Sequence, residues 1–239
     1  MAEQVSGNVG GEHRHEIGRR LTTPRAAAVA GIVFSVLLTV TYVLLRTSVP
    51  ENPNDSGEWL ASNSGRVDFA LWLIPFAGIA FLWFIGVIRD RLGVLEDRFF
   101  SSILFGSGLL FIAMTFVATA LAGALIASYQ IDPVATIDNG LYALERETIF
   151  RVTNVFGVRM AGVFMFSAGT IWLRSGTMPR WMVVLTYSVA VVQIFSLGFT
   201  LWFTILFPLW VLIVSLHFLV YPPTVPVIDR SSTDDVTAD

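Results

Sequence analysis

Composition and charge exclude most classes of soluble protein. Of the 239 residues, 54% are apolar and only 14% are charged, whereas a soluble domain is typically about 25% charged. That deficit excludes an ordinary globular fold and a disordered chain, and the net charge of −3 excludes a basic nucleic-acid-binding module. The chain contains no cysteine and no lysine, so thiolate metal centres, thiol nucleophiles and Schiff-base cofactors are excluded as well.

Long apolar segments predict an integral membrane protein. A helix needs about 20 apolar residues to cross a bilayer, and such segments occur in chain order at 26–45, 69–88, 99–131 and 148–173. Residues 181–220 hold no Asp, Glu or Arg and would form a helix of about 60 Å, twice the thickness of the hydrocarbon. They therefore predict a hairpin of two spans divided near Gly198, with Pro208 inside the last span.

The resulting fold is an all-α bundle of six transmembrane helices. It occupies residues 24–221, between polar tails at 1–23 and 222–239. Ten arginines flank one predicted side of the membrane and four flank the other. Because arginine collects on the cytoplasmic side, both tails are predicted to be cytoplasmic in a bacterial plasma membrane.

Small residues predict where these helices pack. Two spans carry them at four-residue spacing: Ala27, Gly31, Ser35 and Thr39 in the first, and Thr115, Thr119, Gly123 and Ala127 in the third. Both ladders are predicted to be internal packing faces, with pairing across a homodimer as the alternative. Four tryptophans are predicted to anchor the bundle at the membrane interfaces, namely Trp59, Trp172, Trp181 and Trp202.

The fourth span carries a polar stripe that predicts a site. At 100° per residue, Arg151, Asn154 and Arg159 fall on one half of the helix, with Arg159 about 12 Å deeper than Arg151. A central arginine costs about 2.5–3.5 kcal/mol on insertion scales and normally faces the interior of a bundle. Gln193 on the fifth span and Asp68 on the second lie at a similar depth. We predict that these five residues line an outward-facing cavity with a cationic floor.

The two arginines allow two interpretations, and the sequence leaves both open. In the functional one, Arg159 and Arg151 bind an anionic group such as a lipid phosphate or a carboxylate. In the structural one, Arg159 pairs with Asp68 to fix the helix register, and Arg151 pairs with Glu147 one helical turn away.

Enzymatic chemistry receives little support from the sequence. His217 lies one turn from the end of the last span, where a lone histidine is usually an interfacial side chain. The motifs GxSxG, HExxH and GxxxxGK[ST] are all missing from the sequence, and no base is placed beside a nucleophile by spacing. We therefore predict no metal and no cofactor.

The connection after the second span resembles a known transporter signature. Gly86, Asp90, Arg91 and Gly93 match the spacing of the G-x-x-x-D-R-x-G cytoplasmic loop of major facilitator transporters, between the same pair of spans. The two basic residues that follow in that family are apolar here, and the chain has half of its usual twelve spans. The resemblance implies that Asp90 and Arg91 gate a rocking motion between helices.

Residues 173–181 carry a second resemblance. Their sequence, LRSGTMPRW, is similar to the end of a late span in small six-helix bacterial membrane proteins of unknown function. Gly176 and Pro179 suit a tight cytoplasmic turn there, with Arg174 and Arg180 beside it. This resemblance implies a fold and no activity.

Three functions follow from these observations. The first is binding or transport of an anionic lipid or small anion in the outward-facing cavity. The second is a non-catalytic accessory subunit that packs against a membrane-complex partner or a second copy through the small-residue faces. The third is an intramembrane lipid-modifying enzyme that uses Asp68, His217 or another outer acid.

Overall fold

The described part of the chain is helical. The computed structural model describes residues 9–50, 56–92, 98–138, 140–195 and 203–221, and contains no strand in these ranges. The elements are α1 (Val9–Ser48), α2 (Trp59–Ser62), α3 (Ser64–Leu92), α4 (Arg98–Ile131), α5 (Pro133–Asp138), α6 (Leu141–Phe150), the π-helix η1 (Arg151–Gly157), α7 (Val158–Ser175), α8 (Arg180–Phe195) and α9 (Phe203–Val220).

Five helical stretches in this described part are long and apolar enough to cross a membrane. They are Ala26–Ser48, Ser64–Gly86, Phe99–Ile131, Leu141–Ser175 and Phe203–Val220. They correspond to the first four predicted spans and the last one, and they indicate a membrane protein. The remaining apolar helix, α8, has 16 residues, fewer than the roughly 20 that a span needs. The predicted division at Gly198 lies outside the described residues, whereas Pro208 lies inside α9 as predicted.

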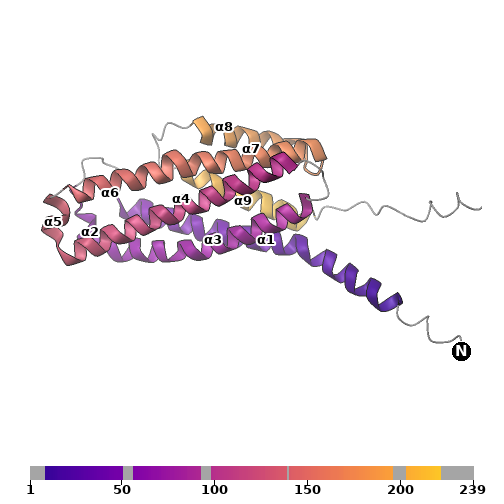
Figure 1. Ribbon diagram of the computed structural model, residues 1–239, viewed down its shortest axis with the longest axis horizontal. Coiled ribbons are helices and arrows are strands. Elements are labelled where there is room, and N and C mark those ends of the chain that lie inside the picture. The colour runs from indigo at the N-terminus through magenta and orange to yellow at the C-terminus, as the bar shows by residue number, and fades with distance from the viewer. Residues whose placement is uncertain (1–8, 51–55, 93–97, 139, 196–202, 222–239) are drawn as a thin grey trace, which may run out of the picture.

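The first helix begins well before its apolar segment. Although residues 1–23 are predicted to be a polar tail, α1 starts at Val9, and its early turns project from the bundle in Figure 1. Extending an existing helix costs far less than nucleating one, so a stable span can continue into polar sequence. The predicted tail at 222–239 lies outside the described residues.

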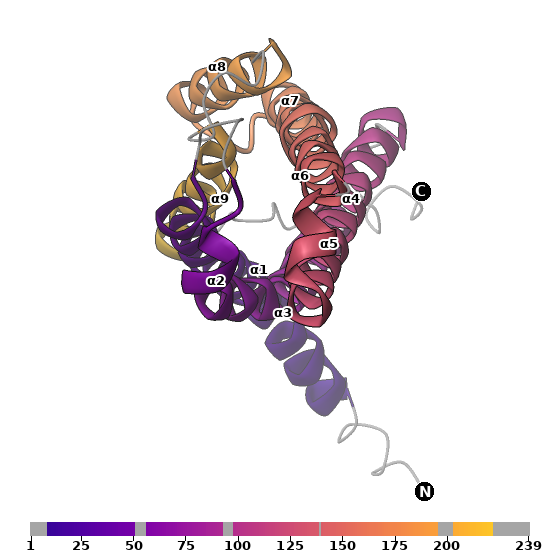
Figure 2. The ribbon, with the colours of Figure 1, turned by 90° about the vertical axis from the view of Figure 1, so that its left-hand side faces the viewer.

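The helices stand around a common axis, which Figure 2 shows end-on. Helix α1 packs between α3 and α9, while α4 packs between α3 and α7, and α8 packs mainly on α7. Helices α1 and α9 are antiparallel, because Gly31 faces Ser215 whereas Tyr42 and Thr204 line one cavity nearer the other end. That other end is formed by α2, α5 and the start of α6 (Figure 1) and is called the α5 end below.

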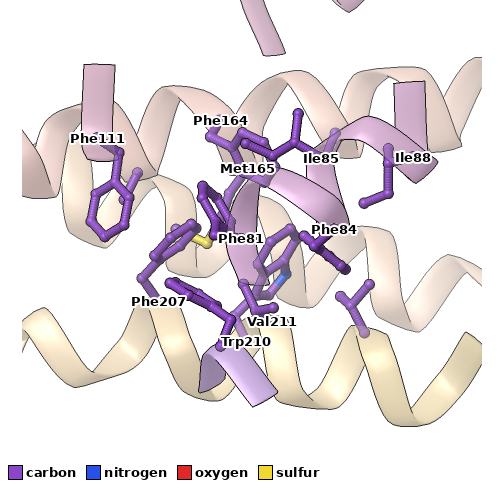
Figure 3. Close-up of a cluster of buried hydrophobic side chains, with 14 of the residues drawn as sticks. Phe81, Phe84, Ile85, Ile88, Phe111, Phe164, Met165, Phe207, Trp210 and Val211 are labelled. Carbon is purple, nitrogen blue, oxygen red and sulfur yellow. The ribbon is translucent and has the colours of Figure 1, made fainter. Parts of the chain in front are cut away.

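Aromatic rings fill the centre of the bundle (Figure 3). Phe81 of α3 is fully buried and stacks on Phe34 at 4.5 Å between ring centroids. Its ring also contacts Phe111 at 5.7 Å, Phe164 at 5.4 Å and Phe207 at 5.5 Å. Rings from five helices therefore meet at one side chain, and dispersion between them holds the centre together.

The first of the two small-residue ladders is an internal packing face from Ala27 to Ser35, and its last residue, Thr39, is half-buried. A side chain on Gly31 would overlap Ser215 Oγ and approach Phe84 Cδ2 to 2.8 Å. By contrast, nothing lies within 4 Å of a side chain built on Gly123, and Ala127 is exposed, so the prediction for the third span is wrong in its second half. Residues four apart drift by about 40° per step, which carries the end of that ladder away from the interior.

The small residue that α4 does use for close packing is Gly108. A side chain there would lie 2.6 Å from Ile85 Cδ1 and 3.1 Å from Phe164 Cδ2. These two contacts come from α3 and α7, the two neighbours of α4.

Two of the predicted interface tryptophans are buried inside the protein. Trp172 is 3% exposed and stacks on Trp210 at 5.8 Å. Trp59 is buried at the α5 end, where its Nε1 donates a 2.9 Å hydrogen bond to Tyr142 Oη. Trp181 is exposed, and Trp202 lies outside the described residues. Aromatic packing within the bundle therefore outweighs interfacial anchoring at two of these positions.

Candidate functional site

A small cavity lies between α1, α4, η1, α7, α8 and α9. Its accessible volume is about 10 Å³, which is room for about one water molecule. Its lining residues are Tyr42, Phe111, Thr115, Thr153, Gly157, Val158, Ala161, Gln193, Thr204 and Phe207. Five of them are polar, each from a different helix, and none is charged. We call this the polar cavity.

Two of the polar side chains of this cavity, Gln193 and Thr204, stand at the ends of their helices. Gln193 lies two residues before the end of α8 and is completely buried, and its Nε2 donates to the Phe203 carbonyl at 3.2 Å. Thr204 is the second residue of α9. Thr115 Oγ1 donates to the Phe111 carbonyl of its own helix at 2.8 Å. A buried amide and several hydroxyls can together donate to and accept from an uncharged polar group.

A second, apolar cavity adjoins the first. It lies among α1, α3 and α4, and is lined by Phe34, Leu38, Ile74, Ala77, Gly78, Phe111, Ile112, Thr115 and Phe116. Phe111 and Thr115 line both cavities, so these two side chains form the partition between them. Phe116 is 40% exposed, which brings the apolar cavity close to the outer surface between α3 and α4.

One wall of the polar cavity is the π-helix η1. The Val158 amide donates to the Thr153 carbonyl, five residues back instead of the four of an α-helix. Thr153 and Gly157 of this segment line the cavity. A side chain on Gly157 would lie 3.3 Å from the Val152 carbonyl oxygen, which is closer than most side chains tolerate. The five-residue turn of η1 therefore forms this wall of the polar cavity and explains why residue 157 is a glycine.

Most of the predicted site residues are engaged within the fourth span itself. Arg159 is half-buried, and its Nη1 donates to the Val155 carbonyl at 2.7 Å. Asn154 is buried, and its Nδ2 donates to the Phe150 carbonyl at 3.1 Å. Both side chains thus bond to backbone in or beside η1, and neither lines the polar cavity.

The remaining two predicted residues lie outside the cavity. Arg151 Nε meets Glu147 Oε1 at 2.7 Å, so the predicted pairing one turn apart is present. Asp68 is exposed on α3. Although both groups are described, no ion pair joins Asp68 to Arg159, and Arg159 bonds instead to its own helix. Of the five predicted site residues, only Gln193 lines the polar cavity.

The sequence does not predict that Tyr42, Thr153 and Thr204 line a cavity, and the reason is physical. Thr204 stands alone in an apolar segment, whereas Tyr42 follows Thr41 and Thr153 precedes Asn154. A threonine costs little in a membrane helix, because its hydroxyl can bond back to its own backbone, and it therefore does not mark a site. The one available signal was the interruption of the fourth span by Asn154, Gly157 and Arg159. That cluster marks η1, although no sequence pattern gives the spacing of a π-helix.

The acid and the histidine of the enzyme hypothesis lie at opposite ends of the bundle. Asp68 follows the start of α3, beside the buried cluster of Trp59 and Tyr142 at the α5 end. His217 lies near the end of α9, with its ring 6.3 Å from that of Trp181 and 5.2 Å from that of Tyr221. Within the described residues, no three His, Asp or Glu side chains are grouped to hold a metal ion.

The chain matches no protein-family profile, no curated protein and no solved structure. The resemblance to major facilitator transporters therefore rests only on Gly86, Asp90, Arg91 and Gly93. Of these, the side chains of Asp90 and Arg91 lie outside what the structure describes.

Proposed function

We propose that this protein binds, or transports, a membrane amphiphile. In this proposal the chain crosses a bacterial plasma membrane six times, with α8 as the short fifth crossing, both termini in the cytoplasm and the α5 end outside. Positive charge near the predicted cytoplasmic ends supports that orientation. The polar part of the amphiphile occupies the polar cavity, and its apolar part enters the adjoining apolar cavity.

The observation that carries this proposal is the pairing of the two cavities. One is lined by polar groups from five helices, the other is lined almost wholly by apolar side chains, and they share Phe111 and Thr115. The pair matches a ligand with one polar and one apolar part in chemical character. Each cavity has an accessible volume of about 10 Å³, so such a ligand has to displace Phe111 and Thr115 to occupy both. The surrounding bilayer supplies molecules of this kind at high concentration.

The character of the cavity favours an uncharged polar group over an anion. No charged side chain lines the cavity, and an anion transferred there would lose its hydration without gaining a cation. The two arginines that the sequence assigns to an anion are engaged by the Val155 carbonyl and by Glu147. Hydroxyl, amide or ester groups are therefore the better candidates.

Removal of the Gln193 amide tests this function. Gln193→Leu keeps the volume of the side chain and removes its hydrogen-bonding groups, while Gln130→Leu makes the same change at an exposed position of α4. Both variants and the unaltered protein are purified from membranes, and the small molecules that remain bound are identified by native mass spectrometry. We expect an amphiphile with an uncharged polar group on the unaltered protein and on Gln130→Leu, and its loss from Gln193→Leu.

Two results would contradict the proposal. Equal retention of the same amphiphile by all three proteins would show that Gln193 does not bind it. Stoichiometric retention of an anionic lipid, lost only when Arg159 or Arg151 is replaced, would restore the anion-binding prediction in place of this one.

A further inference from the structure

The hydroxyl of Tyr42 is a buried hydrogen-bond donor inside the bundle. Tyr42 lies in α1, is 9% exposed and lines the polar cavity. Its Oη forms no hydrogen bond with the residues that the structure describes, whereas the hydroxyl of Tyr187 in α8 lies 2.9 Å from Thr170 Oγ1 and bonds to it. A buried tyrosine hydroxyl usually has a partner, because an unpaired buried donor costs free energy. The cavity is therefore expected to hold an acceptor for this group.

The wall formed by η1 adds two further polar groups. Threonines in membrane helices often bond back to their own backbone, as Thr115 does, but the Thr153 hydroxyl forms no such bond among the described residues. The Val158 amide bonds to the Thr153 carbonyl, and the return to four-residue spacing in α7 then passes over the Asn154 carbonyl. A helical carbonyl points toward the residues three and four places on, and here these are Gly157 and Val158, which line the cavity.

The size and the charge of the polar cavity restrict what can occupy it. Its accessible volume is about 10 Å³, and a water molecule with two to four polar partners needs about 10–15 Å³. No charged side chain lines the cavity, so an ion would lose its hydration without compensation. A larger molecule would have to displace side chains. One water molecule therefore matches both the volume of the cavity and the donors and acceptors of its wall.

The apolar cavity provides an internal comparison. Its accessible volume is also about 10 Å³, but among the described residues that line it Thr115 alone is polar. That hydroxyl donates to the Phe111 carbonyl of its own helix. Cavities with apolar walls stay dry, whereas those with several polar groups hold water. Because the volumes are equal, the difference in lining predicts that the polar cavity is hydrated and the apolar cavity is dry.

We propose that the polar cavity is a binding site for one ordered water molecule, which joins Tyr42 of α1 to η1. The Tyr42 hydroxyl donates to the water, and the water donates to Thr153 Oγ1 and to the Asn154 carbonyl. This inference goes beyond the proposed function and does not rest on it. The water occupies the cavity of the unliganded protein, and the polar group of an amphiphile would take over its hydrogen bonds.

A crystal structure of the delipidated protein, at a resolution that shows ordered water, tests the site directly. We expect one peak about 2.5–3.0 Å from Tyr42 Oη and from a polar atom of η1, and no peak in the apolar cavity. Tyr42→Phe keeps the ring and removes the donor, so the peak should be lost. Tyr187→Phe makes the same change where the hydroxyl already bonds to Thr170, and should keep the peak.

Thermal unfolding in detergent measures the bridge independently. Tyr42→Phe and Thr153→Val each remove one partner of the same water, and each should lower Tm by about 2–4 °C, the shift for one hydrogen bond in a chain of this length. The double variant should lose little more than either single variant, because the first change already releases the water. Tyr187→Phe combined with Thr153→Val is the matched control and should show the sum of its two separate losses.

Three results would overturn the proposal. They are a polar cavity without a peak in the unaltered protein, a peak that persists in Tyr42→Phe, and additive Tm losses for Tyr42→Phe and Thr153→Val. If Tyr42→Phe does not fold, the map of the unaltered protein decides, since it shows both cavities at once. These outcomes are distinct from those of native mass spectrometry: a protein that retains no amphiphile still holds the water, and a dry cavity in the delipidated protein does not decide amphiphile binding.

Discussion

The aromatic centre and the polar cavity are held together by different forces. Around Phe81, rings from five helices are in contact and belong to one large cluster of buried apolar side chains. Around the polar cavity, hydrogen bonds from side chains join helices that pack less closely. Gln193 ties the end of α8 to the start of α9, and further along the same pair of helices Trp210 Nε1 donates to Thr186 Oγ1 at 2.9 Å.

This difference indicates where the molecule is rigid and where it can open. Helices in lipid gain little from the hydrophobic effect, so close packing supplies most of their stability and single hydrogen bonds contribute modestly. The aromatic centre should therefore behave as a fixed partition. The contact between α8 and α9 should be the boundary of the polar cavity that separates most easily, because these two hydrogen bonds supply much of it. In the function proposed above, a ligand would enter or leave there. The unfolding free energies of point variants test this difference.

The largest loss of stability is expected at the aromatic centre. Phe81→Ala removes a completely buried ring and leaves a void where five other rings meet, which should cost about 3 kcal/mol of unfolding free energy. The free energy is measured by titrating the purified protein from mild detergent into a denaturing one. Phe69→Ala is the control, because Phe69 belongs to the same helix and is 55% exposed. Equal losses in the two variants would contradict the assignment of Phe81 to the core.

A smaller loss is expected where α1 and α9 approach most closely. Gly31→Ala places a methyl group against Ser215 Oγ and Phe84, and such overpacking typically costs about 1–3 kcal/mol. Ser215 is completely buried, so Ser215→Gly should create room and restore part of the stability when combined with Gly31→Ala. Gly123→Ala, which meets only open space, should leave the unfolding free energy within about 0.5 kcal/mol of the original. A full loss that Ser215→Gly does not relieve would place the clash elsewhere.

The sequence predicts the spans far better than the site. Long apolar segments fix where helices cross, because hydrocarbon leaves the backbone no alternative to internal hydrogen bonds. Four-residue spacing also identified Gly31 correctly. The same spacing wrongly predicted a packing contact at Gly123, because a periodic pattern does not show which neighbouring helices cover that face. Packing partners are a property of the assembled bundle.

Of the five residues that the sequence offers for a site, only Gln193 lines the polar cavity. The charge of Arg159 made it a candidate, because inserting an arginine into hydrocarbon costs free energy and such residues are usually functional. Its partner is the Val155 carbonyl four residues back in the same span, so the side chain is engaged without a second helix or a ligand. Gln193 was found because a buried amide in an apolar segment is a signal in itself. The hydroxyl groups gave no comparable signal, because a threonine that bonds to its own helix looks the same inside a cavity or outside one.

The smallest effect is expected at the hydrogen bond between α8 and α9. Thr186→Val keeps the shape of the side chain and removes the acceptor for Trp210 Nε1, and such bonds between membrane helices average about 0.6 kcal/mol. Both residues are buried, so the indole N–H gains no water in exchange, and a loss of up to about 1.7 kcal/mol fits the upper end of measured values. Thr47→Val, at an exposed residue of α1, is the matched control and should change nothing measurable. If Thr186→Val costs more than Phe81→Ala in the same titration, hydrogen bonding outweighs packing in this bundle. The boundary between α8 and α9 would then be among its strongest contacts, and a ligand would have to enter by another route.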